Sequence, residues 1–345
     1  MKSVSRVVFL TVVFALALGA GPGMAASQST PAASPAAAGP GTCLTAPIAE
    51  KDTYLIGMSQ ANEGEPWRQA MNDQIAAAAA EHPNLDVVFA DAAQDNATQV
   101  ADVEGFLSQG IDLLIISPNE AAPLTEVVAR ACAEGVPVIV LDRKVEGDQY
   151  TMWIGADNEL IGEQAGAYAA NWCTEEGHDP CQVGEIRGLE GSTPAQERGD
   201  GFRTGSESNT ALEITASQNA DWLREQAVPV SQSMFQANPE LNVLYAHNDP
   251  MAEAAIISAE SMGIDLDSLL VIGIDGLPTP DGGLRSVIDG RIDVTYVYPT
   301  GGVEAIDWAV EILGGNTAPP KEVVLETVEV TSDNAQEVYE QFGGE

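Results

Sequence analysis

The stretch VLYAHNDPMAEAAIISAESMG (243–263) decides the fold class, because it contains an apolar strand, a polar turn and a helix in direct succession. Its first four residues are apolar, as expected for a strand that a parallel sheet buries on both faces. We expect the carboxylate of Asp249 to cap the following helix, with Pro250 in its first turn and Gly263 at its end. A strand that leads into a helix in this way is the repeating unit of an α/β protein.

The same unit recurs along the chain. Apolar residues at 67, 71, 75 and 79 share one face of a predicted helix, and runs such as LLII and VPVIVL are almost wholly apolar. The predicted strands are 54–58, 86–90, 113–116, 136–141, 152–154, 183–186, 213–215, 243–245, 269–274 and 294–297. The prediction is an α/β fold with doubly wound parallel sheets, and 345 residues fit two such sheets better than one.

The N-terminal end of the chain is typical of an exported protein. Lys2 and Arg6 precede an apolar run at 7–20, and small residues follow up to Ala26, which is the order of a secretory signal peptide at 1–26. A retained anchor helix is the alternative, although the run is short for a bilayer. Residues 27–50 are predicted to be a flexible linker, since 27–42 consist almost entirely of Ala, Pro, Ser and Gly. We therefore expect the chain in the periplasm or on the extracellular face of the cell membrane.

The charge balance excludes several kinds of partner. The 14 Lys and Arg residues stand against 52 Asp and Glu, which gives a formal net charge of −38. Such a chain is a poor binder of nucleic acids or of anionic membranes. The motifs GxSxG, HExxH and the phosphate-binding P-loop are absent, so the sequence predicts neither an enzyme nor a cofactor.

The four cysteines predict two disulfides, because an even number in an exported chain is typical of a disulfide framework. Cys173 and Cys181 flank the turn-rich connector TEEGHDP, which favours a local bridge and leaves Cys43 to pair with Cys132. A zinc site is not expected, since there is no CxxC motif and the three histidines are scattered.

Polar side chains follow many of the predicted strands, and ligands of open α/β sheets bind at the carboxyl ends of the strands. Asp142-Arg143, His247-Asn248-Asp249 and Asp275 directly follow apolar runs. Their carboxylates, amide and guanidinium accept from and donate to hydroxyl groups, which favours a neutral polyol as the ligand. Each could instead belong to a turn or a helix cap.

Two further readings of these residues stay open. Asp142 and Asp275 could form the carboxylate pair of a glycoside hydrolase, although Arg143 would keep such an acid ionised. Trp67 and Trp222 could cover the C–H face of a sugar ring, or they could be core residues.

From about Thr53 to the C-terminus the chain resembles the periplasmic sugar-binding proteins of the ribose-binding type, which serve ABC importers. The resemblance depends on VPVIVLDR (136–143), GADN (155–158), AQERGDGF (195–202), ASQNADW (216–222), YAHNDPMAEAAI (245–256) and VIGIDG (271–276). The stretch GMSQANEGEPWR (57–68) is similar to galactofuranose-binding members. The resemblance implies two lobes joined by three crossovers, an N-terminal lobe of 51–154 plus 300–325 and a C-terminal lobe of 155–299 plus 326–345.

The resemblance also implies a set of ligand-binding residues. Arg68 replaces an aromatic residue of the ribose binders, which argues against plain ribose, and either Tyr296 or Tyr298 takes the place of a final glutamine contact. Ser117 stands where ribose binders carry an asparagine. The expected ligand set is Gln60, Trp67, Arg68, Asp142, Arg143, Asn158, Arg198, Trp222, Asn248, Asp275 and Tyr298.

The function implied by the resemblance is capture of a monosaccharide (a furanose, pentose or hexose) by hinge closure. A monomeric chain would then deliver the sugar unaltered to the membrane permease of an ABC importer. Two alternatives are a sugar sensor that feeds a chemoreceptor or a sensor kinase, and a secreted sugar-modifying enzyme.

Overall fold

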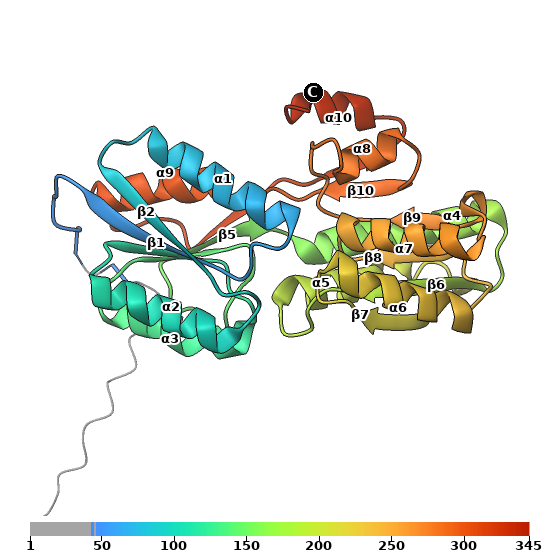
Figure 1. The fold of residues 1–345 in the computed structure, drawn as a ribbon, viewed down its shortest axis with the longest axis horizontal. Coiled ribbons are helices and arrows are strands. Elements are labelled where there is room, and N and C mark those ends of the chain that lie inside the picture. Colours follow the sequence, from blue (N-terminus) through green and yellow to red (C-terminus); the bar gives the residue numbers. More distant parts are fainter. Residues whose placement is uncertain (1–42, 45, 345) are drawn as a thin grey trace, which may run out of the picture. The chain divides into compact units, whose positions relative to one another are not determined.

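The computed structural model describes residues 43–44 and 46–344, so the predicted signal peptide and most of the predicted linker lie outside the described residues. The described chain forms two six-stranded sheets, with strand orders β2-β1-β3-β4-β5-β11 and β7-β6-β8-β9-β10-β12 (Figure 1). Neighbouring strands are parallel except β10 and β12, which are antiparallel. The predicted α/β class with two doubly wound sheets is thereby confirmed.

The first sheet is covered by helices on both faces. Its strands are β1 (Tyr54–Gln60), β2 (Leu85–Asp91), β3 (Leu113–Ile116), β4 (Val138–Leu141), β5 (Met152–Ala156) and β11 (Glu322–Leu325). The helices α1 (Pro66–Ala80) and α9 (Gly302–Leu313) pack together on one face, with α2 (Asn96–Gln109) and α3 (Ala121–Ala133) on the other (Figure 1). The predicted apolar stripe of α1, at 67, 71, 75 and 79, is buried.

The second sheet follows the same plan. Its strands are β6 (Cys181–Arg187), β7 (Leu212–Asn219), β8 (Val243–Ala246), β9 (Leu270–Ile272), β10 (Val294–Val297) and β12 (Val328–Thr331). α4 packs along α5, α6 along α7, and α8 against α10. These helices are α4 (Asn158–Glu176), α5 (Thr193–Ser206), α6 (Arg224–Ala237), α7 (Asp249–Met262), α8 (Gly283–Ile288) and α10 (Ala335–Gln341), and a short 3-10 helix η1 spans Leu266–Ser268.

The chain passes between the two sheets after β5, after β10 and between β11 and β12. These passages divide the described chain into two lobes, each with its own sheet, as in the fold that the resemblance implied. The carboxyl ends of β4 and β5 belong to the first lobe, and those of β8 and β10 belong to the second.

A glycine seam joins α4 to α5 and fixes their spacing. A Cβ atom added at any of four glycines would lie 1.9–2.4 Å from a carbonyl oxygen of the opposite helix, which real Cβ atoms essentially never do. The four pairs are Gly162 with Arg198, Gly166 with Phe202, Gly201 with Glu159, and Gly205 with Glu163. The two backbones are therefore in direct contact, and this contact sets the position of Arg198 relative to the N-terminal end of α4.

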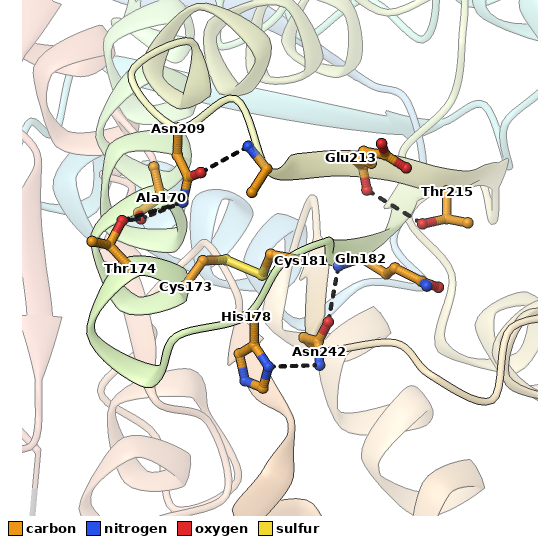
Figure 2. The surroundings of a disulfide bond; sticks show 11 residues. Ala170, Cys173, Thr174, His178, Cys181, Gln182, Asn209, Glu213, Thr215 and Asn242 are labelled. Atoms are coloured by element: carbon orange, nitrogen blue, oxygen red, sulfur yellow. Dashed lines mark hydrogen bonds between the residues drawn. A yellow bond between two sulfur atoms is a disulfide. The ribbon is translucent and has the colours of Figure 1, made fainter.

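Both predicted disulfides are present. Cys173–Cys181 joins the last turns of α4 to the first residue of β6, and Cys43–Cys132 joins the N-terminal segment to α3. Figure 2 shows the first of these beside His178, whose Nδ1 lies 3.3 Å from Nδ2 of Asn242. The Oδ1 atom of Asn242 in turn accepts from the backbone N–H of Gln182 at 2.9 Å, which secures the start of β6.

Some details of the described chain differ from the prediction, and others agree with it. The N-cap of α7 is Asn248, not Asp249, because Oδ1 of Asn248 accepts from the backbone N–H of Met251 at 3.0 Å. The helix ends at Gly263, as predicted. The edge strands β11 and β12 were not predicted. None of the helices in the described chain is long and apolar enough to cross a membrane.

Candidate functional site

A cavity of about 280 Å³ is lined by residues that follow strands or begin helices in both lobes. That figure includes open solvent, and the space that the centre of a water-sized molecule can occupy is only about 20 Å³, so the lining side chains nearly fill the cavity in this conformation. The lining residues are Glu65, Trp67, Arg68, Asp142, Arg143, Pro194, Arg198, Trp222, Asn248, Asp275 and Tyr298.

On the first-lobe side, Arg68 of α1 is held against Asp142, which directly follows β4. Its Nη2 donates to Oδ2 of Asp142 at 3.0 Å, and its Nη1 donates to Oε1 of Gln60 and to Oγ of Ser117, each at 2.8 Å. Asp142 has a backbone φ of 65°, a left-handed conformation that non-glycine residues seldom adopt. The indole N–H of Trp153 donates to its carbonyl oxygen at 2.9 Å, which supports this conformation.

Tyr298, which follows β10 in the second lobe, connects the two lobes at the cavity. Its hydroxyl donates to Oδ1 of Asp142 at 2.9 Å and accepts from Nδ2 of Asn158 at 3.2 Å. The indole N–H of Trp67 donates to the carbonyl oxygen of Tyr298 at 2.8 Å, and the two ring centroids are 5.3 Å apart. Burial and the nearby carboxylate of Asp142 raise the pKa of Tyr298, so its hydroxyl stays a donor.

Arg143 lies next to Asp142 and is almost fully buried. Its Nη1 donates to the carbonyl oxygen of Asn119 at 2.8 Å. The centre of its guanidinium is 5.5 Å from the ring centroid of Trp222, within the range of a cation–π contact. Burial and the positive charge of Arg68 lower the pKa of Arg143 to about 9, so the side chain remains a cation at neutral pH.

Arg198 of α5 approaches Trp222 from the second lobe. Its Nε donates to Oδ1 of Asn158 at 2.8 Å, and its Nη1 donates to the carbonyl oxygen of His247. The guanidinium is 5.4 Å from the ring centroid of Trp222 and 4.6 Å from that of Tyr298. Two of its five N–H donors are used in these bonds, which leaves three for a ligand.

Asn248 and Asp275 complete the second-lobe side. Nδ2 of Asn248 donates to the carbonyl oxygen of Trp222 at 3.1 Å. Asp275 has a backbone φ of 124°, and only 7% of its surface is exposed. No described residue donates a hydrogen bond to its carboxylate, and burial together with the nearby carboxylate of Asp249 raises its pKa well above the ordinary value. Strain and unmet hydrogen-bonding capacity in one residue are typical of a binding site.

The formal charges around the cavity cancel. Three guanidinium groups and three carboxylates line it, belonging to Arg68, Arg143, Arg198, Glu65, Asp142 and Asp275. Arg68 and Asp142 form an ion pair, whereas within the described chain Arg198 has no carboxylate oxygen within 4.0 Å. No group of three or more His, Cys, Asp or Glu that could hold a metal ion occurs among the described residues. Unused donors opposite unused acceptors, without excess charge, suit a neutral polyhydroxylated ligand.

The structure brings together all the predicted ligand residues except two. Gln60 and Asn158 do not line the cavity but hold Arg68, Arg198 and Tyr298, which do. Of the two tyrosines considered, Tyr296 points elsewhere, since its hydroxyl donates to Glu329 at 2.9 Å.

Sequence reasoning missed two lining residues, Glu65 and Pro194. Both stand at the start of a helix rather than at the end of a strand, Glu65 as the N-cap of α1 and Pro194 in the first turn of α5. In both cases the sequence signal that could have identified the position is the proline in the first turn of the helix.

Comparisons with known proteins agree with this geometry. Residues 56–317 match the periplasmic binding protein domain. The chain is 31% identical to the ribose import binding protein of Bacillus subtilis, over 71% of this chain and 76% of that protein. It is 27% identical to the galactofuranose-binding protein of Escherichia coli, over 83% of this chain and 90% of that protein.

Solved structures give the same result. The fructose-binding periplasmic domain of a hybrid two-component system is 38% identical with a TM-score of 0.79, and the match covers 84% of this chain and 94% of that one. A galactofuranose-binding protein is 27% identical with a TM-score of 0.78, covering 84% of this chain and 98% of that one. These relatives are named for the sugars they bind and not for any reaction. With two lobes, a polar cavity lined from both, and a family match over most of its length, the chain belongs to the periplasmic binding proteins, among the sugar-binding members related to the ribose and galactofuranose binders.

Proposed function

We propose that this protein captures a monosaccharide between its two lobes and delivers it unaltered to the membrane permease of an ABC importer. The observation that carries the proposal is a pair of unused hydrogen-bonding groups on the second-lobe side of the cavity, the guanidinium of Arg198 and the carboxylate of Asp275, in a cavity that first-lobe residues also line. A ring with neighbouring hydroxyl groups satisfies both at once, since each hydroxyl can accept from one and donate to the other. The signal peptide proposed for residues 1–26 would bring the chain to the compartment in which such capture takes place.

The proposed binding step is closure of one lobe on the other. Trp67, Arg68, Asp142 and Arg143 belong to the first lobe, while Arg198, Trp222, Asn248 and Asp275 belong to the second. A sugar that touches both sets stabilises only the conformation in which both sets are close, so binding shifts the population toward the closed form. The permease would then recognise that form.

The identity of the sugar is proposed only as a class. The indole rings of Trp67 and Trp222 can cover the C–H faces of a five- or six-membered ring. Arg68 fills space with a charged, hydrogen-bonded group where an aromatic residue was expected from ribose binders, which favours a ligand with more polar groups on that side.

A thermal-shift screen tests the proposal. The panel contains D-ribose, D-fructose, L-arabinose, D-galactose, D-allose and myo-inositol, and hits are confirmed by calorimetric titration. A sugar present at 100 times its Kd stabilises the folded state by about 2.7 kcal/mol, which raises the melting temperature by roughly 5–10 °C. Recovery of the unchanged sugar from the complex separates binding from turnover. If no saccharide raises the melting temperature, the proposed function is wrong.

A second candidate is a sugar sensor that feeds a signalling kinase. It is favoured by the fructose-binding domain of a hybrid two-component system, which is 38% identical to this chain. Both functions use the same cavity, so ligand binding does not distinguish them. Capture of the sugar-loaded protein's membrane partner does: a permease supports import, and a sensor kinase supports signalling.

A further inference from the structure

The indole N–H of Trp222 donates to none of the described residues, although only 4% of the Trp222 surface is exposed. The indole N–H of Trp67, by contrast, donates to a backbone carbonyl. Trp222 also has a backbone φ of 74°, and that of the preceding Asp221 is 51°, both in the left-handed region. A bulky residue in this region is strained. Its neighbours must therefore hold the ring in place.

One neighbour of the Trp222 ring is the backbone of Gly188. A Cβ atom at this position would lie 2.2 Å from two atoms of the Trp222 ring, so the indole rests directly on the glycine backbone. The amide N–H of Gly188 donates to Nδ1 of His247 at 3.4 Å. The His247 ring itself is 6.2 Å from the indole, measured between centroids. The imidazole of His247 therefore holds the Gly188 backbone, which in turn supports the Trp222 ring.

The other ring nitrogen of His247 is fixed by a buried carboxylate. Nε2 of His247 lies 3.2 Å from Oε1 of Glu185, which is fully buried in β6. Glu185 also accepts from Nη2 of Arg203 at 2.8 Å and from Oγ of Ser217 at 2.6 Å. Because Nδ1 must accept the proton of the Gly188 amide, the ring proton belongs on Nε2, where it is donated to Glu185.

The charges around the imidazole fit this neutral form. The charged groups that face it are Glu185 and Arg187 from β6 and Arg198 from α5, with Arg203 reaching it through Glu185. Burial lowers the pKa of His247, and the two arginines act in the same direction, although Glu185 opposes them. Gly199 of α5 packs closely against the same side chains, because a Cβ atom added there would lie 3.2 Å from an atom of Glu185 and from an atom of Arg203.

We propose that His247 is a positioning residue for Trp222: its Nδ1 holds the Gly188 amide on which the indole rests, and Glu185, with Arg203 and Ser217, holds the imidazole in the tautomer that this requires. The proposal rests on the proposed function, in which Trp222 covers one face of the saccharide. It adds a layer of residues that do not touch the sugar and yet determine how tightly the sugar is held.

Two substitutions of His247 separate its two bonds. The amide of His247→Asn occupies the place of Nδ1 and can still accept from Gly188, whereas that of His247→Gln occupies the place of Nε2 and can reach only Glu185. The probe is D-fructose, the sugar named for the relative with 38% identity. We expect His247→Asn to bind it within threefold of the wild type and His247→Gln to lose roughly tenfold, the equivalent of one buried hydrogen bond.

The matched control is Ser258→Ala. Ser258 is a buried hydroxyl of the same lobe that bonds Ser231 and the backbone of α7, and it does not line the cavity. This variant loses buried hydrogen bonds and should keep wild-type affinity. Equal affinity of both His247 variants with the wild type would overturn the proposal, and so would an equal loss in both, because that pattern indicates a purely structural histidine.

A ligand-free readout keeps the proposal testable if no sugar binds. The indole N–H signal of Trp222 is assigned in nitrogen-15 NMR spectra by its disappearance in Trp222→Phe. We expect it to shift or broaden in His247→Gln and to stay in place in His247→Asn and Ser258→Ala. An unmoved signal in His247→Gln refutes the positioning role. If no sugar in the thermal-shift panel raises the melting temperature, that result contradicts the proposed function. The positioning role of His247 is then decided by the NMR signal of Trp222.

Discussion

Replacement of Asp275 by asparagine is expected to stabilise the ligand-free protein and to weaken sugar binding, two effects of opposite sign. The carboxylate is buried, accepts no hydrogen bond from the described residues and lies near a second buried carboxylate, Asp249. Each of these features penalises the charge in the folded state. The amide of asparagine has the same shape, no charge, and a similar tolerance of positive φ.

The stability change follows from the raised pKa of Asp275. Every unit by which folding raises a carboxyl pKa costs about 1.4 kcal/mol at pH values above the folded pKa, so the variant gains about that amount there for each unit. For a chain of this size, 1 kcal/mol corresponds to roughly 2–4 °C in melting temperature. The penalty is absent below the unfolded pKa of 3.8, grows as the pH rises above it, and is full once the pH exceeds the folded pKa. The gain should therefore be larger at pH 7 than at pH 4, where it should nearly disappear.

The affinity change has a different origin. Two free carboxylate oxygens can each accept a hydroxyl of the sugar, and a hydrogen bond to a charged group is worth about 1.5–3 kcal/mol. Asparagine keeps one acceptor oxygen and replaces the other with an NH2 group, so one such bond is lost, which corresponds to roughly a 10- to 10²-fold weaker Kd. The assays are thermal unfolding at pH 7 and pH 4, and calorimetric titration with the sugar identified by the thermal-shift screen.

The control is Asp307→Asn, which removes the same charge from an exposed position in α9 and should change neither quantity. The reasoning fails if Asp275→Asn melts below the wild type at pH 7, since the carboxylate would then have a stabilising partner. It also fails if the variant binds the sugar as tightly as the wild type.

Three further predictions concern the groups around the cavity and the disulfides. Arg68→Met should lower the free energy of unfolding in urea by about 3–5 kcal/mol, because it removes the ion pair of the buried Asp142; a loss below 1 kcal/mol would mean that Asp142 is satisfied without it. Tyr298→Phe should weaken sugar binding roughly five- to tenfold by releasing Asp142 from a hydrogen bond, and titration of the variant with unchanged Kd would exclude this role. Serine replacement of Cys43 and Cys132, which are 89 residues apart, should lower the free energy of unfolding by about 4.6 kcal/mol. The same replacement of Cys173 and Cys181, which are 8 residues apart, should lower it by about 2.5 kcal/mol. Urea unfolding that gave the reverse order would contradict the loop-entropy argument.

Most of the fold could be predicted because buried parallel strands are continuous apolar runs. β3 and β10 were predicted with their observed bounds. β11 and β12 were missed because each is a four-residue strand at the edge of a sheet, too short to show a clear apolar run and with one glutamate in each of EVVL and VEVT. Only pairing with β5 and β10 identifies these segments as strands, and pairing is a tertiary property.

The cavity could be predicted to a similar degree and for a related reason. Parallel strands bring their carboxyl ends to one edge of each sheet, so Asp142 and Asp275 could each be placed at such an edge from their positions after strands. That the edges of two different sheets meet at one cavity was implied only by the resemblance. The division between lining and supporting residues could not be predicted. Gln60 and Asp142 both follow or end a strand and both accept from Arg68, yet only Asp142 lines the cavity, a difference that depends on tertiary packing. Glu185 gave one unused signal, a carboxylate directly between the glycine and the isoleucine of the predicted strand VGEI (183–186).

The glycine seam between α4 and α5 limits how the recognition properties of this protein can be redesigned. The two helices meet through main-chain atoms at four crossing points, so no exchange of side chains can widen or re-register them. Library mutagenesis aimed at a new sugar should leave Gly162, Gly166, Gly201 and Gly205 untouched and randomise Arg68, Trp67 and Pro194 instead. A reporter dye or circular permutation placed along this pair of helices would disturb Arg198 and, with it, the response that a biosensor is meant to record.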